Sequence, residues 1–468
     1  MRKFFYIIST IIALSAISSC CNNNGYGYKI KNGVAIYNTP ARPADQISMI
    51  SFAAEPIDTV RVGFIGLGMR GPGAVDRFLH IDGVKVVALC DLYQERVDAV
   101  QHMFTSRGME HVAGYSGEEG WKQLCDRNDI DLVYIATPWL THVPMAVYAM
   151  ESGKHVAIEV PAATSIDECW QLVNTAERTR RHCMMLENCV YDFFELTTLN
   201  MAQQGLFGEI IHAEGAYIHN LDPFWRDYQG NWRYDFNKAN RGDVYPTHGL
   251  GPACQVLNIH RGDRMKTLIA MDTDTFNGKK VAEMFGEESY ANGDHTTTLI
   301  RTEKGKTIEI QHNVVTPRPY NRMYQVEGTE GFANKYPNEG YSIRTLGREG
   351  DNLSKNFENL DGEAYVSNEM RNILMIEYQH PITREGSLVE TAKRVGGHGG
   401  MDFIMDYRLI YCLRKGLPLD QDVYDAAEWS CLGELTRVSI ENGNIPVVMP
   451  DFTRGDWNKT NGLKLHLK

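Results

Sequence analysis

A glycine-rich turn between an apolar run and a helical stretch constrains the fold of this chain more than any other feature. The run 60–65 is followed by Gly66, Gly68 and Gly71, a GxGxxG pattern. In such a turn the first glycine permits a sharp bend, the second lets backbone N–H groups approach a pyrophosphate, and the third lets the helix pack on the strand. The pattern therefore predicts a dinucleotide site at the end of the first strand of a parallel sheet.

Apolar runs and helical stretches alternate after this turn. Strands are expected at 60–65, 84–90, 132–136, 155–158 and 183–186. The helix before the last of these opens at Ser165, with Glu168 in capping-box register. Alternation of this kind is typical of a doubly wound parallel α/β sheet, which we place at residues 58–190.

A second pattern begins near residue 200, where strand-like runs lengthen and fewer helices separate them. Strands are expected at 210–218, 296–301, 307–315 and 324–327, and closing helices at 401–416 and 423–443. Consecutive strands favour a largely antiparallel sheet, so residues 191–468 are predicted to form an α+β domain. An exposed face of this second sheet would suit a homodimer.

Residues 1–20 have the features of an export signal. Arg2 and Lys3 precede an apolar run at 4–17, and small residues before Cys20 form a cleavage site. The segment resembles a bacterial lipoprotein signal, which implies an exported protein that touches the membrane only through a lipid on Cys20. A plain secretory peptide with an incidental cysteine is the alternative. Residues 21–57, rich in Asn, Gly and Pro, are predicted to be a tether.

Charge and cysteine spacing exclude several kinds of function. The 468 residues include 47 Lys and Arg against 59 Asp and Glu, a net charge of −12, so nucleic acid is not expected as a partner. The cysteines after Cys21 show no CxxC pairs or short Cys/His spacing, so neither a metal site nor a disulfide framework is expected. Buried free thiols are the simpler interpretation.

The predicted dinucleotide site extends beyond the glycine turn. Asp91 closes the second strand, where its carboxylate can accept hydrogen bonds from the adenosine ribose and repel a 2′-phosphate, so NAD is expected rather than NADP. Two later turns, 136–142 and 159–161, fall at the same sheet edge; for Trp139 and His142, packing at a helix start is the alternative. The residues expected to contact the cofactor are Gly66, Gly68, Met69, Arg70, Gly71, Asp91, Trp139, Leu140, Thr141, His142, Glu159, Val160 and Asn188.

These motifs resemble those of the Gfo/Idh/MocA family, which pairs an N-terminal Rossmann domain with a sheet domain that carries the substrate site. The resemblance rests on the glycine turn, the turn at 136–142, Glu159-x-Pro161, and the segments 242–248 and 328–331. Family dehydrogenases usually carry Glu-Lys-Pro, in which the lysine relays a proton, whereas this chain has Val160 in the middle position. The resemblance to a dehydrogenase is therefore incomplete at the reacting centre.

Five motifs, one of them the Glu159-x-Pro161 turn already named, together resemble glycoside hydrolase family 109. They lie at 159–161, 231–234, 245–248, 317–320 and 397–402. The resemblance implies an α-N-acetylgalactosaminidase that keeps NAD bound and acts on glycans ending in α-linked N-acetylgalactosamine. It also implies a retaining route in which hydride leaves carbon 3 of the sugar, the group on carbon 1 is eliminated, water adds, and the hydride returns.

This route needs acid and base groups, and Tyr245 and His248 are the first candidates. A histidine titrates near neutral pH, and a cation or NAD beside a tyrosine can lower its pKa from the usual value of ~10. The residues expected to contact the substrate are Tyr217, Arg233, Tyr245, Thr247, His248, Tyr320 and His398. Two alternatives stay open: an NAD-dependent sugar oxidoreductase with net turnover, and a non-catalytic glycan-binding lipoprotein that contains NAD.

Overall fold

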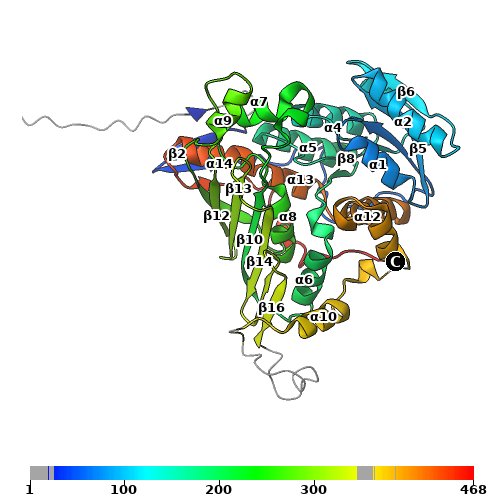
Figure 1. Ribbon diagram of the computed structural model, residues 1–468. Helices are drawn as coiled ribbons and strands as arrows, with labels where there is room; N and C mark the ends of the chain where they lie inside the picture. The colour runs from blue at the N-terminus through cyan, green and yellow to red at the C-terminus, as the bar shows by residue number, and fades with distance from the viewer. Residues whose placement is uncertain (1–18, 21–25, 345–361, 363, 385, 468) are drawn as a thin grey trace, which may run out of the picture.

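The computed structural model describes residues 19–20, 26–344, 362, 364–384 and 386–467. Figure 1 shows a parallel sheet flanked by helices, in blue and cyan, next to a larger sheet in green and yellow. The expected signal segment lies outside the described residues except for Ser19 and Cys20. Within the described ranges, none of the helices combines the length and the apolar composition that a membrane span requires.

The first sheet has six parallel strands in the order β6-β5-β4-β7-β8-β9. The strands are β4 (Val60–Ile65), β5 (Val84–Asp91), β6 (Ala113–Ser116), β7 (Leu132–Ile135), β8 (His155–Ile158) and β9 (Cys183–Met185), and the helices between them are α1 (Gly71–Phe78), α2 (Gln94–Ser106), α3 (Gly120–Cys125), α4 (His142–Glu151) and α5 (Ile166–Thr179). Every residue of β7, β8 and β9 is buried, because helices cover both faces of the sheet. The doubly wound prediction is confirmed, with β6 as an additional strand. Successive strands are added on one side of β4 as far as β6 and on its other side from β7 onward. Ligands bind in such folds at the point where this order reverses, between β4 and β7.

The second sheet is larger and mixed, in the order β1-β2-β3-β17-β11-β12-β13-β10-β14-β15-β16. Its strands are β1 (Ser19–Cys20), β2 (Tyr28–Lys31), β3 (Val34–Tyr37), β10 (Ile210–Ile218), β11 (Met265–Asp272), β12 (Thr296–Thr302), β13 (Thr307–Asn313), β14 (Asn321–Gly328), β15 (Gly331–Asn334), β16 (Gly340–Ile343) and β17 (Val447–Val448). Most neighbours are antiparallel, while β10 runs parallel to β13, and β17 to β3. The prediction of a largely antiparallel second sheet is confirmed.

Helices of the second half pack on this sheet and also reach back to the first one. They are α6 (Phe193–Gln203), α7 (Trp232–Ala239), α8 (Thr247–Val256), α9 (Gly278–Met284), α10 (Asn368–Glu377), α11 (Leu388–Val395), α12 (Met401–Lys415), α13 (Val423–Ser430) and α14 (Leu432–Glu441). Both predicted closing helices are present, although the second is divided at Cys431 into α13 and α14. Helix α12 packs on α1, where Arg77 Nε donates to Asp406 Oδ2 at 2.6 Å. The cysteines described from Cys90 to Cys431 are free and buried, as expected.

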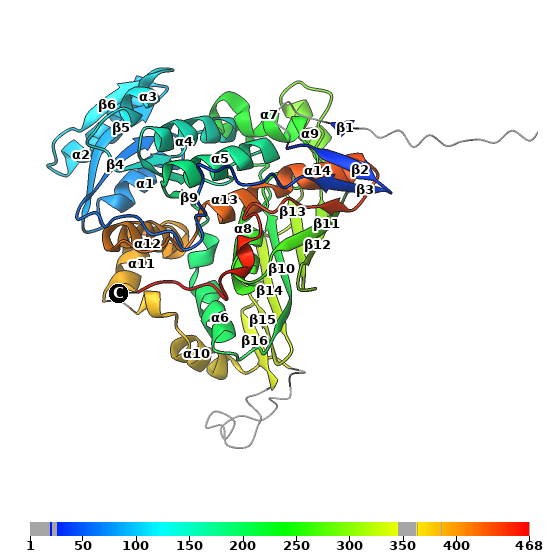
Figure 2. The same ribbon diagram turned by 180° about the vertical axis from the view of Figure 1, so that it is seen from behind.

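The segment 21–57, expected to be a tether, belongs largely to the folded body. Strands β2 and β3 form a hairpin around Asn32 and Gly33, which both have positive φ, and β3 pairs with β17. Figure 2 shows this hairpin beside α14. Further along, the Met49 N–H donates to the Tyr424 hydroxyl at 3.0 Å. These contacts correct the tether prediction from residue 26 onward. The Asn-Gly pair between alternating residues is a strong hairpin signal in the sequence.

Candidate active site

The glycine turn has the form that a pyrophosphate requires. Gly66 has a φ of +94°, and a Cβ at this position would lie 2.5 Å from Ala136 O. A Cβ on Gly71 would collide with Gly66 O. Helix α1 follows with Arg70 as its N-cap, and within the described ranges no side chain caps its first turn. No described side chain therefore competes with a phosphate at the start of α1, and the residues fit a dinucleotide.

Asp91 lies beside this turn, as predicted, but its carboxylate is already engaged. Oδ2 accepts from Leu67 N at 2.7 Å, and Oδ1 accepts from Tyr93 N at 3.0 Å and from Arg96 Nη1 at 3.2 Å. Arg96 adds a positive charge, which offsets the repulsion of a 2′-phosphate on which the preference for NAD depends. The ribose contact and the preference over NADP therefore stay predictions.

His142 joins the two turns at the carboxyl edge of the sheet. Its Nδ1 lies 2.8 Å from Pro161 O and its Nε2 2.7 Å from Thr137 O, and the residue is fully buried. Because both nitrogens are used, the ring braces the two turns, and a contact of His142 with the cofactor stays a prediction. The other predicted residues of these segments are buried at Trp139, Glu159, Val160 and Asn188, half-buried at Thr141, and exposed at Met69 and Leu140.

Asp402 of α12 draws several predicted residues together. Its Oδ1 accepts from Asn188 Nδ2 at 2.6 Å, and its Oδ2 accepts from Arg70 Nη2 at 3.1 Å. His398 Nδ1 lies 3.0 Å from the same carboxylate, and Arg70 Nε lies 3.5 Å from Glu159 Oε1. Burial alone would raise the pKa of Asp402, but His398 and Arg70 hold it well below its usual value. His398, predicted as a substrate contact, is thus placed beside the predicted cofactor residues.

Arg233 lies within a group of four aromatic rings. Its guanidinium carbon is 4.8 Å from the ring centre of Tyr245, 5.1 Å from Tyr228, 5.2 Å from Trp139 and 5.9 Å from Tyr217. Trp139, in the short 3-10 helix η1 (Trp139–Thr141), stacks on Tyr245 with ring centres 5.3 Å apart. Since Trp139 belongs to the first domain and Tyr245 to the second, the cofactor edge directly contacts the predicted sugar-binding residues.

Tyr245 and His248 are brought to β10 by a close crossing of backbones. A Cβ on Gly249 of α8 or on Gly215 of β10 would collide with the other element, so glycine is required at both positions. The ring centres of Tyr245 and His248 are 5.1 Å apart, and Tyr217 of β10 lies 4.6 Å from Tyr245. The three predicted residues therefore form one group.

The pKa of Tyr245 depends mainly on burial. Burial raises this pKa well above its usual value, and the nearby Arg233, which lowers it, does not offset the effect. The phenol is therefore protonated at neutral pH and acts as a hydrogen-bond donor. Arg233 alone therefore does not bring this pKa below its usual value, and a lowering by bound NAD stays a prediction.

The two remaining predicted substrate residues lie in contrasting places. Tyr320 is exposed, with its ring 5.1 Å from His219, whose Nδ1 lies 2.9 Å from the Tyr217 hydroxyl. Thr247 is fully buried, and no hydrogen-bond partner of its hydroxyl lies among the described residues. Tyr320 is thus accessible, whereas the Thr247 side chain is buried, and the substrate contacts of both residues stay predictions.

A cluster that the sequence analysis missed lies against His248. Glu187 Oε2 is 2.8 Å and Cys189 Sγ is 3.3 Å from His248 Nδ1, and the three side chains have the close spacing that a metal site requires. Arg322 Nη1 lies 2.5 Å from Cys189 Sγ and already supplies a positive charge there, so we interpret the group as a hydrogen-bonded cluster. Glu187 lies two residues after β9, and this position at the carboxyl edge of the sheet is the signal that could have identified it.

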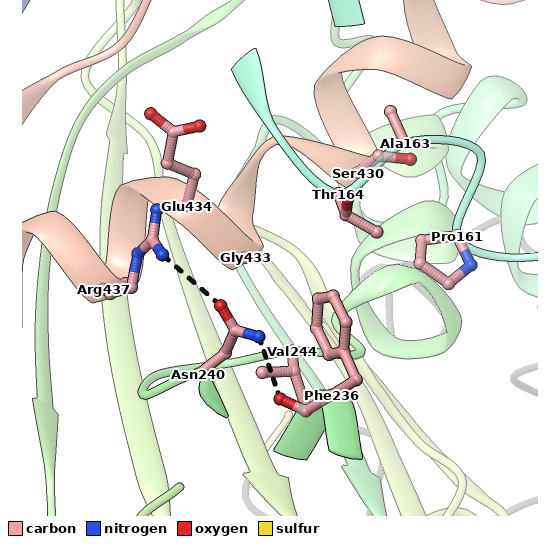
Figure 3. Close-up of a pocket in the computed structure, with 10 residues that line it drawn as sticks. All are labelled: Pro161, Ala163, Thr164, Phe236, Asn240, Val244, Ser430, Gly433, Glu434 and Arg437. Carbon is pink, nitrogen blue, oxygen red and sulfur yellow. Dashed lines mark hydrogen bonds between the residues drawn. The ribbon is translucent and has the colours of Figure 1, made fainter. Parts of the chain in front are cut away.

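Figure 3 shows a small pocket behind this site, between α7, α14 and the turn after β8. It is lined by Pro161, Ala163, Thr164, Phe236, Asn240, Val244, Ser430, Gly433, Glu434 and Arg437. Arg437 Nη1 donates to Asn240 Oδ1 at 3.3 Å, and Asn240 Nδ2 donates to Phe236 O at 2.9 Å. These bonds fix the end of α7, the helix that carries Arg233, and none of the predicted site residues lines the pocket.

Two family models match the chain. Residues 191–459 match the glycosyl hydrolase 109 C-terminal domain, and residues 60–187 match the oxidoreductase family with an NAD-binding Rossmann fold. The chain is 59% identical over 468 residues to glycosyl hydrolase family 109 protein 1 of Bacteroides thetaiotaomicron, with 99% of each chain covered. It is 63% identical over 427 residues to glycosyl hydrolase family 109 protein 1 of Phocaeicola vulgatus, with 90% of each chain covered.

A solved structure of levoglucosan dehydrogenase in complex with NADH has the same fold. It superposes with a TM-score of 0.63 at 17% identity and covers 84% of this chain and 100% of that chain. The Rossmann match and the geometry of the glycine turn together assign NAD binding to the first domain. On the match of its second domain and its identity to these relatives, the chain belongs to glycosyl hydrolase family 109.

Proposed function

We propose that this chain is an NAD-dependent glycosidase that removes terminal α-linked N-acetylgalactosamine from glycans. The contact of Trp139 with Tyr245 and Arg233 carries the proposal, because it sets acid/base and sugar-binding groups against the NAD domain. The names of the two relatives, both glycosyl hydrolases, support hydrolysis. Val160 is buried where related dehydrogenases hold a lysine, and this favours a reaction without net oxidation.

NAD, when bound, supplies reversible hydride transfer at carbon 3 of the sugar. The residues of the chain move protons and hold the substrate. Elimination breaks the C2–H bond, whose electron pair forms a C1–C2 double bond, and the bond from C1 to the leaving oxygen, which takes up a proton. Water then adds a hydroxyl at C1 and a hydrogen at C2 with retention. His248 takes and returns a proton, the neutral Tyr245 donates a hydrogen bond to a sugar oxygen, and Arg233 binds hydroxyl or acetamido oxygens.

The test is incubation of the purified protein in deuterated water, without added cofactor. The substrates are the 4-nitrophenyl α- and β-glycosides of N-acetylgalactosamine and of galactose. We expect nitrophenol release from the α-N-acetylgalactosaminide, with deuterium at carbon 2 of the freed sugar. If all four glycosides are inert and NADH accumulates when NAD and free sugars are supplied, the protein is a net oxidoreductase. Glycan binding without any turnover would favour a non-catalytic binding protein.

We also propose that the chain is an exported lipoprotein anchored through Cys20 and that it forms a homodimer. The basic start and the apolar run before Cys20 support export. Ile269 and Leu299, which pair across β11 and β12, and the neighbouring Met271 are exposed on the outer face of the large sheet and support the dimer. The variant Cys20→Ser is expected to leave the membrane fraction, and sedimentation equilibrium gives the mass of the assembly.

A further inference from the structure

Glu187 is a buried carboxylate with no role in the function described so far. It is fully buried two residues after β9, and its carboxylate lies 2.8 Å and 3.0 Å, through Oε2 and Oε1, from His248 Nδ1. Oε1 also accepts the Cys189 N–H at 2.8 Å, and the Glu187 carbonyl accepts from Gln421 Nε2 at 2.9 Å. These bonds fix both the backbone and the side chain of Glu187.

Packing holds the Glu187 side chain in one place. A Cβ on Gly251 of α8 would lie 2.9 Å from Glu187 Cγ and 3.1 Å from the Trp429 ring. The side chain is therefore enclosed by α8, which carries His248, and by α13, which carries Trp429. A carboxylate fixed in this way aligns the histidine beside it.

Glu187 is ionised despite its burial. Burial alone would raise its pKa. The contact with His248 and the hydrogen bonds from Cys189 lower the pKa by more than burial raises it, so that it lies below its usual value. An ionised carboxylate only accepts hydrogen bonds, so the hydrogen of a neutral His248 lies on Nδ1. Nε2 is then the nitrogen that can accept a proton.

Other groups around His248 do not provide this function. Burial raises the pKa of the Cys189 thiol well above its usual value, although the adjacent Arg322 lowers it, so the sulfur is a neutral neighbour. The rings of Tyr217 and Tyr245 lie 5.6 Å and 5.1 Å from the imidazole, and burial raises the pKa of both phenols.

We propose that Glu187 is a positioning residue for His248, which holds the Nδ1–H tautomer and stabilises the imidazolium formed when Nε2 takes a proton from the sugar. In that step the C–H or O–H bond of the substrate breaks, an N–H bond forms at Nε2, and Glu187 stays ionised throughout. The inference rests on the proposed function, because it assigns proton transfer to His248.

The test compares the wild-type protein with Glu187→Gln, which keeps the shape of the side chain and removes its charge. We expect kcat on the 4-nitrophenyl glycoside to fall at least ~100-fold, with KM changed less than ~3-fold. The acidic limb of the kcat profile should move to lower pH, because the imidazolium loses its counter-charge. Glu434→Gln is the matched control, since its half-buried carboxylate bonds Tyr37 and Ile166 N away from His248 and its loss should change none of these values.

Nitrogen-15 NMR of histidine-labelled protein gives a readout independent of turnover. In the wild-type protein His248 should show a protonated Nδ1 and an acceptor Nε2, and Glu187→Gln should show a mixture of tautomers. Wild-type activity together with an unchanged kcat, pH profile and tautomer in Glu187→Gln would overturn the inference. A wild-type protein inactive on every glycoside would instead refute the proposed function, while the NMR spectra would still show whether Glu187 sets the tautomer.

Discussion

At the scale of single residues, Arg233, Tyr245 and Glu187 share deep burial but hold different charges. Burial disfavours the charged form of each side chain. Arg233 keeps its charge, with a raised pKa, because the hydroxyls of Tyr228 and Tyr217 accept hydrogen bonds from it at 3.0 Å and 3.4 Å. Glu187 keeps its charge through His248, whereas Tyr245 remains a neutral phenol. These three side chains thus supply one cation, one buried anion and one neutral phenol.

The neutral phenol of Tyr245 leads to a first prediction. Tyr245→Phe keeps the stack on Trp139 and removes only the hydrogen-bond donor, so kcat should fall ~100-fold with KM nearly unchanged. Steady-state kinetics on the 4-nitrophenyl glycoside measures this. Tyr234→Phe is the control, because that ring stacks on Phe285 away from the site, and equal losses in the two variants would refute the role of the hydroxyl.

His312 of β13 leads to a prediction of pH dependence. Burial, with a contribution from Arg233, lowers its pKa to about 3, whereas an unfolded histidine has a pKa of ~6.5. The unfolded chain therefore binds a proton first as pH falls, and the stabilisation by neutral His312 is lost between pH ~6.5 and ~3. We expect His312→Phe to reduce the slope of unfolding free energy against pH by up to ~1.4 kcal/mol per unit between pH 6 and 4.

Urea unfolding at pH 7.5, 6.0 and 4.5 measures this slope. His102→Asn, on the exposed face of α2, should keep the wild-type slope. If His312→Phe and the wild-type protein lose stability in parallel over this range, the linkage argued for His312 is wrong.

At this scale the sequence identified candidate site residues, but it did not predict their burial or their contacts. Tyr245, His248 and Arg233 were identified because their motifs are local. Glu187 was missed because its partner His248 is distant in the sequence and comes near only through the crossing of α8 and β10. The burial that raises the Tyr245 pKa was missed for the same reason, since burial is a property of the packed molecule.

At the scale of elements, α12 links the second half of the chain to the glycine turn. Asp402 and Asp406 lie one helical turn apart, and both are fully buried. Asp402 accepts from Arg70 and Asn188, whereas Asp406 accepts from Arg77 of α1. The first carboxylate therefore orders predicted cofactor residues, and the second joins two helices.

This difference predicts separate effects of two similar substitutions. Asp402→Asn should weaken NAD binding at least ~10-fold, or ~1.4 kcal/mol, because Arg70 and Asn188 lose their shared anchor. Asp406→Asn should lower the thermal midpoint and leave NAD affinity within ~2-fold of the wild-type value. Titration calorimetry with NAD on cofactor-stripped protein measures the first effect, and calorimetric melting the second. Equal losses of affinity would show that Asp402 only holds α12 in place.

The success of prediction at the element scale depended on whether the signal was local. The strands and the helix that starts at Ser165 follow from alternation and from a cap, and Ser165 Oγ indeed accepts the Glu168 N–H at 3.2 Å. The hairpin around Asn32 also had a local signal, the Asn-Gly pair. The high Asn, Gly and Pro content of residues 21–57 led to the prediction of a tether instead. The pairing of β3 with β17 had no local signal, since the two strands are far apart in the sequence.

At the scale of the whole molecule, Glu177 of α5 joins segments from both ends of the chain. This fully buried carboxylate accepts from Tyr424 of α13 at 2.6 Å, from Arg42 Nε at 3.1 Å and from Arg454 Nη1 at 2.5 Å. Arg42 lies in the segment expected as a tether, and Arg454 lies beyond β17. The segments that carry Arg42 and Arg454 are therefore both held on the first domain through one side chain.

Removing this charge is expected to destabilise the fold as a whole. Glu177→Gln leaves the guanidinium of Arg454 buried without its counter-charge, and the loss of one partner from a buried ion pair costs ~3 kcal/mol or more. Glu151→Gln is the control, since its pair with Arg178 is solvent-exposed and contributes less than ~1 kcal/mol. Urea unfolding at pH 7 compares the two variants. A loss of the same size in both would mean that the terminal segments add little to stability, and that the fold depends on the two sheets alone.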